Sequence, residues 1–200
     1  MNRLHTFGCG IRTKPGSTAN WTWRAVQATH LETPYQAQAV EYYTPAIGRP
    51  FRNKHRAQRL LATVLPFVDR PLHVAVHSNG ADVLMDAMKI QPFHIEVCHM
   101  ISPAISADCR DVGSGLNKLL YSGKIKQLHI WIGGKDWALR LGKTAVGQLW
   151  GYGALGLDGP KYLLPGFDVT VRREPDFGHE TWFDEEHFDD TMKRIWGGRV

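Results

Sequence analysis

The sequence predicts an α/β fold, with a mostly parallel sheet of about six strands and helices on both of its faces. Short apolar runs rich in β-branched and aromatic residues recur along the chain, and most are separated by segments long enough for a helix. Strands joined by such crossovers pair in parallel. Ligands of parallel sheets bind outside the carboxyl ends of the strands, so functional residues should follow strands.

The predicted elements alternate along the chain. The predicted strands are residues 4–7, 38–43, 73–77, 94–101, 128–132 and 168–172. The clearest predicted helices, with apolar residues at three- and four-residue steps, are 52–68, 80–89 and 185–196. Segments 8–37 and 137–167 are the least regular. The second, rich in aromatic residues, leucines and glycines, is equally consistent with a loop packed on the core and with the lining of a binding cleft.

Composition indicates one globular domain spanning residues 1–200. The 200 residues are 43% hydrophobic and 22% charged, without a repeat or low-complexity linker. No signal-peptide core and no run approaching about 18 apolar residues is present, so we expect a cytoplasmic protein without stable membrane insertion. Cys9, Cys98 and Cys109 are odd in number and lack C-x-x-C spacing. Reduced thiols are therefore expected, and no metal is implied.

A net charge of +5 comes largely from the segment 49–59, which holds five arginine and lysine residues. The simplest interpretation is the solvated face of the helix predicted there. An anionic partner is the alternative, but no aromatic residues are interleaved as in a stacking platform, so no nucleic-acid partner is expected. The oligomeric state stays open.

The sharpest local signal is the run 74–81, Val-Ala-Val-His-Ser-Asn-Gly-Ala, in which a strand pattern breaks at Ser78 and passes directly into a helical pattern. Such a turn presents the serine hydroxyl above the sheet. The backbone N–H of Asn79 then points toward a developing oxyanion at the helix N-terminus. A serine at this place is also a common helix cap.

The segment His77-Ser78-Asn79-Gly80 resembles the nucleophile elbow of the α/β-hydrolase family. Val76 stands where that family usually has glycine or another small residue. The resemblance implies Ser78 as nucleophile and an oxyanion hole formed by the backbone N–H of Asn79 together with that of Gly8 or Cys9. It also implies a small version of the fold, without the two N-terminal antiparallel strands and without a large cap.

The family supplies its acid and its histidine after the serine, in that order. Asp136 ends a Gly-Gly-Lys-Asp turn after the strand 128–132, where the resemblance implies the orienting acid; alone, it could be a helix cap. His179 follows Gly178 after the last predicted strand, where the family's general base lies. Three turns of the right type in the right order carry the resemblance, which spans nearly the whole chain.

The expected function is a serine esterase of the carboxylesterase or lipase-like type, which cleaves a small-molecule or lipid ester through Ser78, His179 and Asp136 without a cofactor. A non-catalytic ligand-binding protein of the same fold is one alternative. A thioesterase, amidase or acyltransferase with the same triad is another. A metal site of His77, His94 and His99 is disfavoured because these side chains lie on different elements or alternate between faces.

Overall fold

The computed structural model describes residues 3–8, 20–40, 49–110, 115–144, 147 and 152–197. Its centre is a six-stranded sheet in the order β2-β1-β3-β4-β5-β6, in which every neighbouring pair is parallel. The prediction of a parallel sheet of about six strands is therefore confirmed. The strands are β1 (Leu4–Gly8), β2 (Gln36–Val40), β3 (Leu72–His77), β4 (Ile95–Ile101), β5 (Ile125–Gly133) and β6 (Asp168–Glu174).

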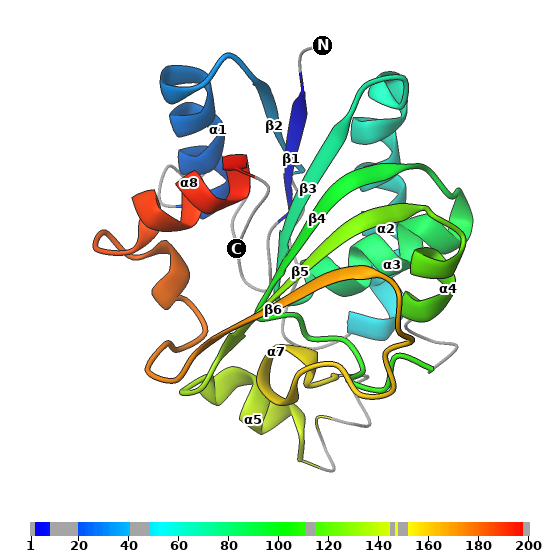
Figure 1. Cartoon of the computed structure of the whole chain (residues 1–200), viewed down its shortest axis with the longest axis vertical. Helices are drawn as coiled ribbons and strands as arrows, with labels where there is room; N and C mark the ends of the chain where they lie inside the picture. The colour runs from blue at the N-terminus through cyan, green and yellow to red at the C-terminus, as the bar shows by residue number, and fades with distance from the viewer. Residues whose placement is uncertain are drawn as a thin grey trace.

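Helices cover both faces of the sheet, with α1 and α8 on one side and α2, α3 and α4 on the other (Figure 1). This is the three-layer arrangement that crossover connections produce. The α-helices are α1 (Trp21–Glu32), α2 (Arg49–Val64), α3 (Gly80–Ile90), α4 (Leu116–Tyr121), α5 (Trp137–Gly142), α7 (Leu155–Asp158) and α8 (Phe188–Gly197). Two short 3-10 helices are η1 (Leu65–Phe67) and η2 (Thr181–Phe183).

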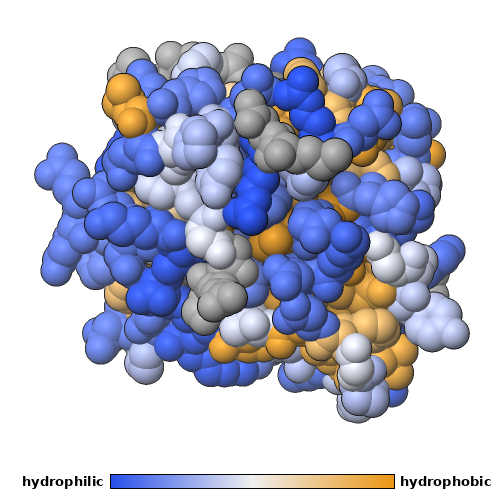
Figure 2. Space-filling model, turned by 45° about the horizontal axis from the view of Figure 1, so that its top comes forward, coloured by the Kyte–Doolittle hydropathy of each residue, from blue (hydrophilic) through white to orange (hydrophobic). Residues whose placement is uncertain are grey.

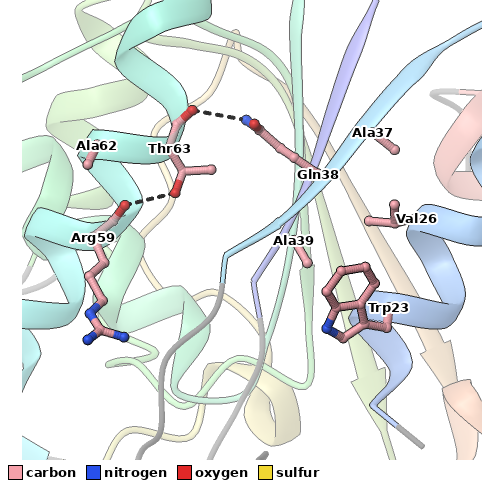
Figure 3. A pocket seen from close by; sticks show the side chains of 8 residues that line it. All are labelled: Trp23, Val26, Ala37, Gln38, Ala39, Arg59, Ala62 and Thr63. Carbon is pink, nitrogen blue, oxygen red and sulfur yellow. Dashed lines mark hydrogen bonds between the residues drawn. The ribbon is translucent and has the colours of Figure 1, made fainter. Parts of the chain in front are cut away.

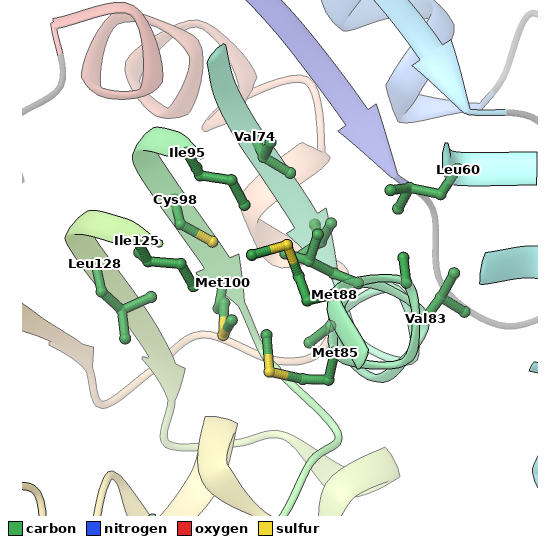
Figure 4. Close-up of a cluster of buried hydrophobic side chains, with 14 of the residues drawn as sticks. Leu60, Val74, Val83, Met85, Met88, Ile95, Cys98, Met100, Ile125 and Leu128 are labelled. Carbon is green, nitrogen blue, oxygen red and sulfur yellow. The ribbon is translucent and has the colours of Figure 1, made fainter. Parts of the chain in front are cut away.

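The layer between the sheet and α2 and α3 is aliphatic and sulfur-rich (Figure 4). Val74 of β3 pairs in register with Cys98 of β4, and Cys98 pairs with Leu128 of β5. Met85 and Met88 of α3 are buried in the same cluster. Burial raises the pKa of the Cys98 thiol to about 12, so it behaves as a small apolar side chain.

The opposite layer, under α1 and α8, is aromatic. Trp131 of β5 and Trp182 of η2 are both fully buried and meet edge to face, with ring centroids 5.2 Å apart. Four histidines on neighbouring strands lie on this face, and we call them the histidine row: His5, His73, His99 and His129. The two faces of the sheet thus differ in chemistry.

Four α-helices, α1, α4, α5 and α7, were not among the helices predicted from the sequence, and α1 is the longest of them. Helix α1 lies within the segment 8–37, which we had interpreted as irregular. Its buried side includes Thr22 and Thr29 beside its apolar residues, which weakens the apolar periodicity. The Asn20 side chain caps it by accepting a hydrogen bond from the Thr22 N–H at 3.1 Å.

The cationic segment of α2 is not uniformly solvated. Arg59 is exposed, as a solvated face predicts, but Arg56 is only 5% exposed and donates a hydrogen bond to Asn53 at 2.7 Å. That part of the prediction is wrong because Arg56 belongs to a buried polar network. The side chains of residues 49–52 lie outside the described part of the structure.

The face shown in Figure 2 is mainly hydrophilic, with apolar side chains gathered toward its lower right. Single exposed apolar residues are ordinary on protein surfaces. Within the described ranges, no helix combines the length and the apolar character needed to cross a membrane.

Candidate active site

Ser78 lies in a strained turn between β3, which ends at His77, and α3, which begins at Gly80. Its φ of 54° is in the left-handed region, which costs a non-glycine residue about 1–3 kcal/mol. The turn is fixed from both sides. The Ser78 N–H donates to the Ile101 carbonyl at 3.0 Å, and the Ser78 carbonyl accepts from the Ala104 N–H at 3.1 Å.

A buried polar network supports the residue after the serine. The side-chain amides of Asn79 and Asn53 donate to each other at 3.4 and 3.5 Å, and Arg56 also donates to Asn53. Asn53 donates at 2.5 Å to Asp82, in the first turn of α3. Helix α2 therefore holds the start of α3, and with it the turn at Ser78.

The structure also accounts for Val76 at a position where the resembling family usually has a small residue. Val76 is fully buried, and its register partner on β1 is Gly8. Because Gly8 has no side chain, the isopropyl group of Val76 has room on the side of β1. Gly8 is the last residue of β1, beside the strand that leads to Ser78; Cys9, the alternative oxyanion donor, lies outside the described residues.

Asp136 is fully buried in the turn between β5 and α5. One carboxylate oxygen, Oδ1, caps α5 by accepting the Leu139 N–H at 2.9 Å. The other, Oδ2, lies 2.7 Å from Nδ1 of His179. Asp136 is thus both the helix cap and the histidine partner that the sequence left as alternatives.

Two glycines allow the turns that carry Asp136 and His179 to approach each other. A Cβ atom on Gly133 would lie 2.7 Å from the Phe177 carbonyl oxygen, and one on Gly134 would overlap the backbone of Pro175. The Lys135 N–H donates to the Phe177 carbonyl at 2.9 Å. The Gly-Gly sequence therefore permits the hydrogen bonds that place the carboxylate beside the imidazole.

His179 lies between β6 and η2, with 12% of its side chain exposed. The preceding Gly178 N–H donates to Oγ1 of Thr181 at 3.0 Å, which closes the turn. Because the Asp136 carboxylate accepts a hydrogen bond at Nδ1, the other ring nitrogen, Nε2, is left to act on a substrate or a nucleophile.

The sequence indicated His77, at the end of β3, only as the residue before Ser78 and as a member of a disfavoured metal site. The ring of His77 lies 4.6 Å from that of His179, centroid to centroid, and Nε2 of His77 donates to the His179 carbonyl at 3.0 Å. Burial lowers the pKa of His77 to about 4, against an opposing effect of the nearby Glu180 carboxylate. Strand alternation was the available signal, because it puts residue 77 on the α1 and α8 face with Ala75.

The structure therefore joins two of the three predicted triad residues directly and brings the third to the same region. Asp136 and His179 are hydrogen-bonded, and Ser78 directly follows His77, which contacts His179. No hydrogen bond links the Ser78 hydroxyl to His179 among the described residues. Such contacts are often long in unliganded enzymes and tighten when substrate is bound.

A second serine with a left-handed backbone, Ser102, lies at the end of the neighbouring strand β4. It is fully buried, and its hydroxyl accepts a hydrogen bond from the Trp182 indole at 3.2 Å. Ser102 therefore has a structural partner, and it offers a matched comparison for Ser78.

A hollow of about 690 Å³ lies beside the edge strand β2, away from β5 and β6 (Figure 3). Gln38 crosses it to donate to the Thr63 carbonyl at 3.2 Å. The lining residues are Trp23, Val26, Ala37, Gln38, Ala39, Arg59, Ala62 and Thr63. No acid–base pair is among these side chains, so the hollow is separate from the site at Asp136 and His179.

The structure does not bring His77, His94 and His99 together, in agreement with the sequence analysis, which disfavoured a metal site of these three residues. His94 is exposed before β4. His99 is fully buried on the same face as His77, but its register partner on β3 is Ala75, two residues before His77. Within the described ranges, the one group with suitable spacing is His77, His179 and Glu180.

Comparison with known proteins identifies the fold. No family model and no curated protein sequence matches the chain. A solved structure from Agrobacterium vitis S4 has a TM-score of 0.61 at 13% identity, covering 100% of this chain and 88% of the other. The Bacillus megaterium epoxide hydrolase has a TM-score of 0.57 at 12% identity, with coverages of 98% and 94%. The carboxylesterase CesB from Bacillus subtilis has a TM-score of 0.53 at 13% identity, with coverages of 100% and 85%. The chain has the α/β-hydrolase fold.

Proposed function

We propose that the protein is a serine hydrolase that cleaves a carboxylic ester through Ser78, His179 and Asp136. The observation that carries the proposal is the hydrogen bond between buried Asp136 and His179. It forms at the carboxyl ends of the strands, where Ser78 also occupies a strained strand-to-helix turn. The solved structures of similar fold include an epoxide hydrolase and a carboxylesterase, which supports hydrolytic chemistry.

In the proposed mechanism, Nε2 of His179 removes the Ser78 proton while Oγ attacks the ester carbonyl carbon. The backbone N–H of Asn79 and that of Gly8 or Cys9 stabilise the oxyanion. The imidazolium then protonates the departing alcohol. Water, deprotonated by the same histidine, cleaves the acyl-enzyme and releases the acid. Asp136 keeps the imidazole oriented and stabilises its charged form.

The surroundings of the site favour an apolar ester. Trp137 and Leu141, on α5 directly after Asp136, are 65% and 59% exposed and four residues apart, so they share one side of the helix. An exposed aromatic and a leucine beside the catalytic residues would contact an acyl chain, which is consistent with a small apolar or lipid ester as the substrate.

The proposal is tested by labelling the wild type, Ser78→Ala and His179→Ala with a fluorophosphonate and locating the adduct by mass spectrometry. We expect an adduct on Ser78 that is absent from the first variant and forms far more slowly in the second. Ser102→Ala is the matched control, because it also removes a hydroxyl from a left-handed residue at a strand end; its labelling should match the wild type.

Two outcomes would overturn the proposal. An adduct that persists in Ser78→Ala would place the reactive group elsewhere. A folded wild type that never reacts would favour the alternative, a ligand-binding protein that uses the same fold without catalysis. Thioester and amide substrates tested beside esters then distinguish acyl-transfer chemistries that share the triad.

A further inference from the structure

His77, Glu180 and the proposed base His179 form a compact group of possible metal ligands. Each offers one ligand atom, and these three atoms lie within 4.8 Å of one another. His77 is buried at the end of β3, whereas the Glu180 side chain is exposed, so the group has one rigid wall and one side open to solvent.

Hydrogen bonds already orient both imidazoles. A backbone carbonyl can only accept, so the contact between Nε2 of His77 and the His179 carbonyl places the His77 proton on Nε2 and leaves a lone pair on Nδ1. Asp136 likewise holds Nδ1 of His179 and leaves Nε2. A histidine held by a carboxylate or a backbone carbonyl at one nitrogen is the usual arrangement of a metal-ligating histidine.

We propose that His77, His179 and Glu180 form a binding site for zinc or a similar divalent transition-metal ion, and that the bound ion inhibits the hydrolase. Two imidazole nitrogens and one carboxylate oxygen are a ligand set that Zn²⁺ accepts, with a fourth position for water. Tetrahedral ligands about 2.0–2.1 Å from Zn²⁺ lie about 3.3 Å apart. The exposed Glu180 side chain can rotate to close the remaining distance.

The inhibition follows from the nitrogen that the ion uses, and this part of the inference rests on the proposed function. If Zn²⁺ occupies Nε2 of His179, that nitrogen has no lone pair to accept the proton of Ser78. The ion and the activated serine therefore exclude each other. Asp136 supports either state, because it orients the same imidazole for proton transfer and for metal binding.

Binding is measured by calorimetric titration of the wild type, Glu180→Gln and Glu32→Gln with Zn²⁺ at pH 7.5. Glu32 is an exposed glutamate at the end of α1, so its variant makes the same chemical change away from the site. We expect one equivalent of Zn²⁺ to bind the wild type and Glu32→Gln with equal affinity, and about tenfold or more weaker binding to Glu180→Gln. Equal affinity in all three proteins would overturn the site.

Inhibition is measured as the rate of fluorophosphonate labelling across the same zinc concentrations. Each rate is expressed relative to that of the same protein without zinc. The relative rate of the wild type should fall as the site fills, whereas Glu180→Gln should need about tenfold more zinc to reach the same relative rate. Zinc-bound wild type that labels at the full rate would overturn the inhibition. Zinc-stimulated ester hydrolysis by Ser78→Ala would also overturn it, in favour of a catalytic ion.

Failure of the site and failure of the proposed function give different results. A wild type that never labels but binds zinc through Glu180 disproves the hydrolase and keeps the ion site. A wild type that labels at Ser78 but shows no zinc binding that depends on Glu180 keeps the hydrolase and disproves the ion site. His77→Gln, checked for folding by circular dichroism, provides a second ligand variant and should also weaken binding.

Discussion

At the residue scale, Ser78 and Ser102 share a backbone conformation but differ in their hydroxyls. Both have positive φ at the ends of adjacent strands. The Ser78 N–H donates to the Ile101 carbonyl of β4, and the Ser102 N–H donates to the Trp131 carbonyl of β5, both at 3.0 Å. The Ser102 hydroxyl is used by Trp182, whereas Ser78 is followed by an eleven-residue helix, α3, whose N-terminus favours developing negative charge. This difference is why we assign the nucleophile to Ser78.

Asp136→Asn should lower kcat for ester hydrolysis by about 10⁴-fold, the loss seen when the equivalent change in a serine protease stabilises the wrong histidine tautomer. Folding should survive, because an asparagine oxygen can still accept the Leu139 N–H that caps α5. The measurement is kcat on a soluble ester, with circular dichroism to verify the fold.

Asp184→Asn is the control for that variant. Asp184 lies 2.7 Å from Nδ1 of His187, the same distance as in the pair of Asp136 and His179, but the carboxylate is exposed. Its kcat should remain within about twofold of the wild type, since surface pairs contribute little. Equal losses in both variants would mean that the effect does not depend on the triad.

At the element scale, the turns after β5 and β6 act as one unit, and glycine makes their contact possible. Gly134→Ala would force a methyl group into the Pro175 backbone. We expect a loss of about 1–3 kcal/mol in the free energy of unfolding, as for overpacked sites. The labelling rate at Ser78 should fall by about 10²-fold, because His179 and Asp136 are displaced. Urea unfolding and labelling kinetics measure the two effects.

Gly197→Ala is the matched control for Gly134→Ala. Gly197 is in α8, and among the described residues no atom outside the backbone of that helix lies within 4 Å of its Cβ position. The alanine should leave labelling unchanged and should not lower stability, because alanine is the better helix former. If Gly134→Ala behaved in the same way, the close approach of the two turns would not be needed for the site.

The strands and the ends of β3, β5 and β6 could be predicted from the sequence because apolar periodicity and turn-forming residues are local features of the chain. The positions of Ser78, Asp136 and His179, each after a strand, are signalled locally in the same way, and their catalytic roles stay a prediction. Helix α1 was missed because threonines occupy part of its buried side. The contacts of Arg56 and His77 depend on which helix lies over which face of the sheet. A single sequence does not contain that information in any local pattern.

At the scale of the whole molecule, the histidine row crosses four neighbouring strands inside one layer. His5 and His73 are register partners with ring centroids 4.9 Å apart, and His99 and His129 are register partners 4.7 Å apart. All four side chains are less than 5% exposed. Protonation of an imidazole in this layer would place a charge away from water, which is costly.

Burial is the main reason that the pKa values of His5, His73 and His99 are low. It lowers the pKa of His5 to about 3, with further lowering by His73 and Arg3. It lowers the pKa of His73 to about 4, with Arg3 lowering it further and Glu96 opposing. The pKa of fully buried His99 also lies well below its usual value, through burial and the neighbouring histidines.

The protein should therefore lose stability in mild acid. A histidine whose pKa is about 6.5 in the unfolded chain and about 4 or lower in the folded protein binds its proton only on unfolding between these values. The contribution of such a histidine to the free energy of unfolding is full above pH 6.5. It falls as the pH drops toward 4, by about 1.4 kcal/mol per pH unit for each histidine.

Urea unfolding at pH 7.5, 6.5, 5.5 and 4.5 measures how steeply the free energy of unfolding depends on pH. His5→Phe, which keeps an aromatic ring beside Phe7 and Tyr35, should make the slope shallower by about one proton, whereas His55→Gln, at an exposed position on α2, should leave it unchanged. A free energy of unfolding that stays constant from pH 6.5 to 4.5 would show that the row is already accessible to protons in the folded state.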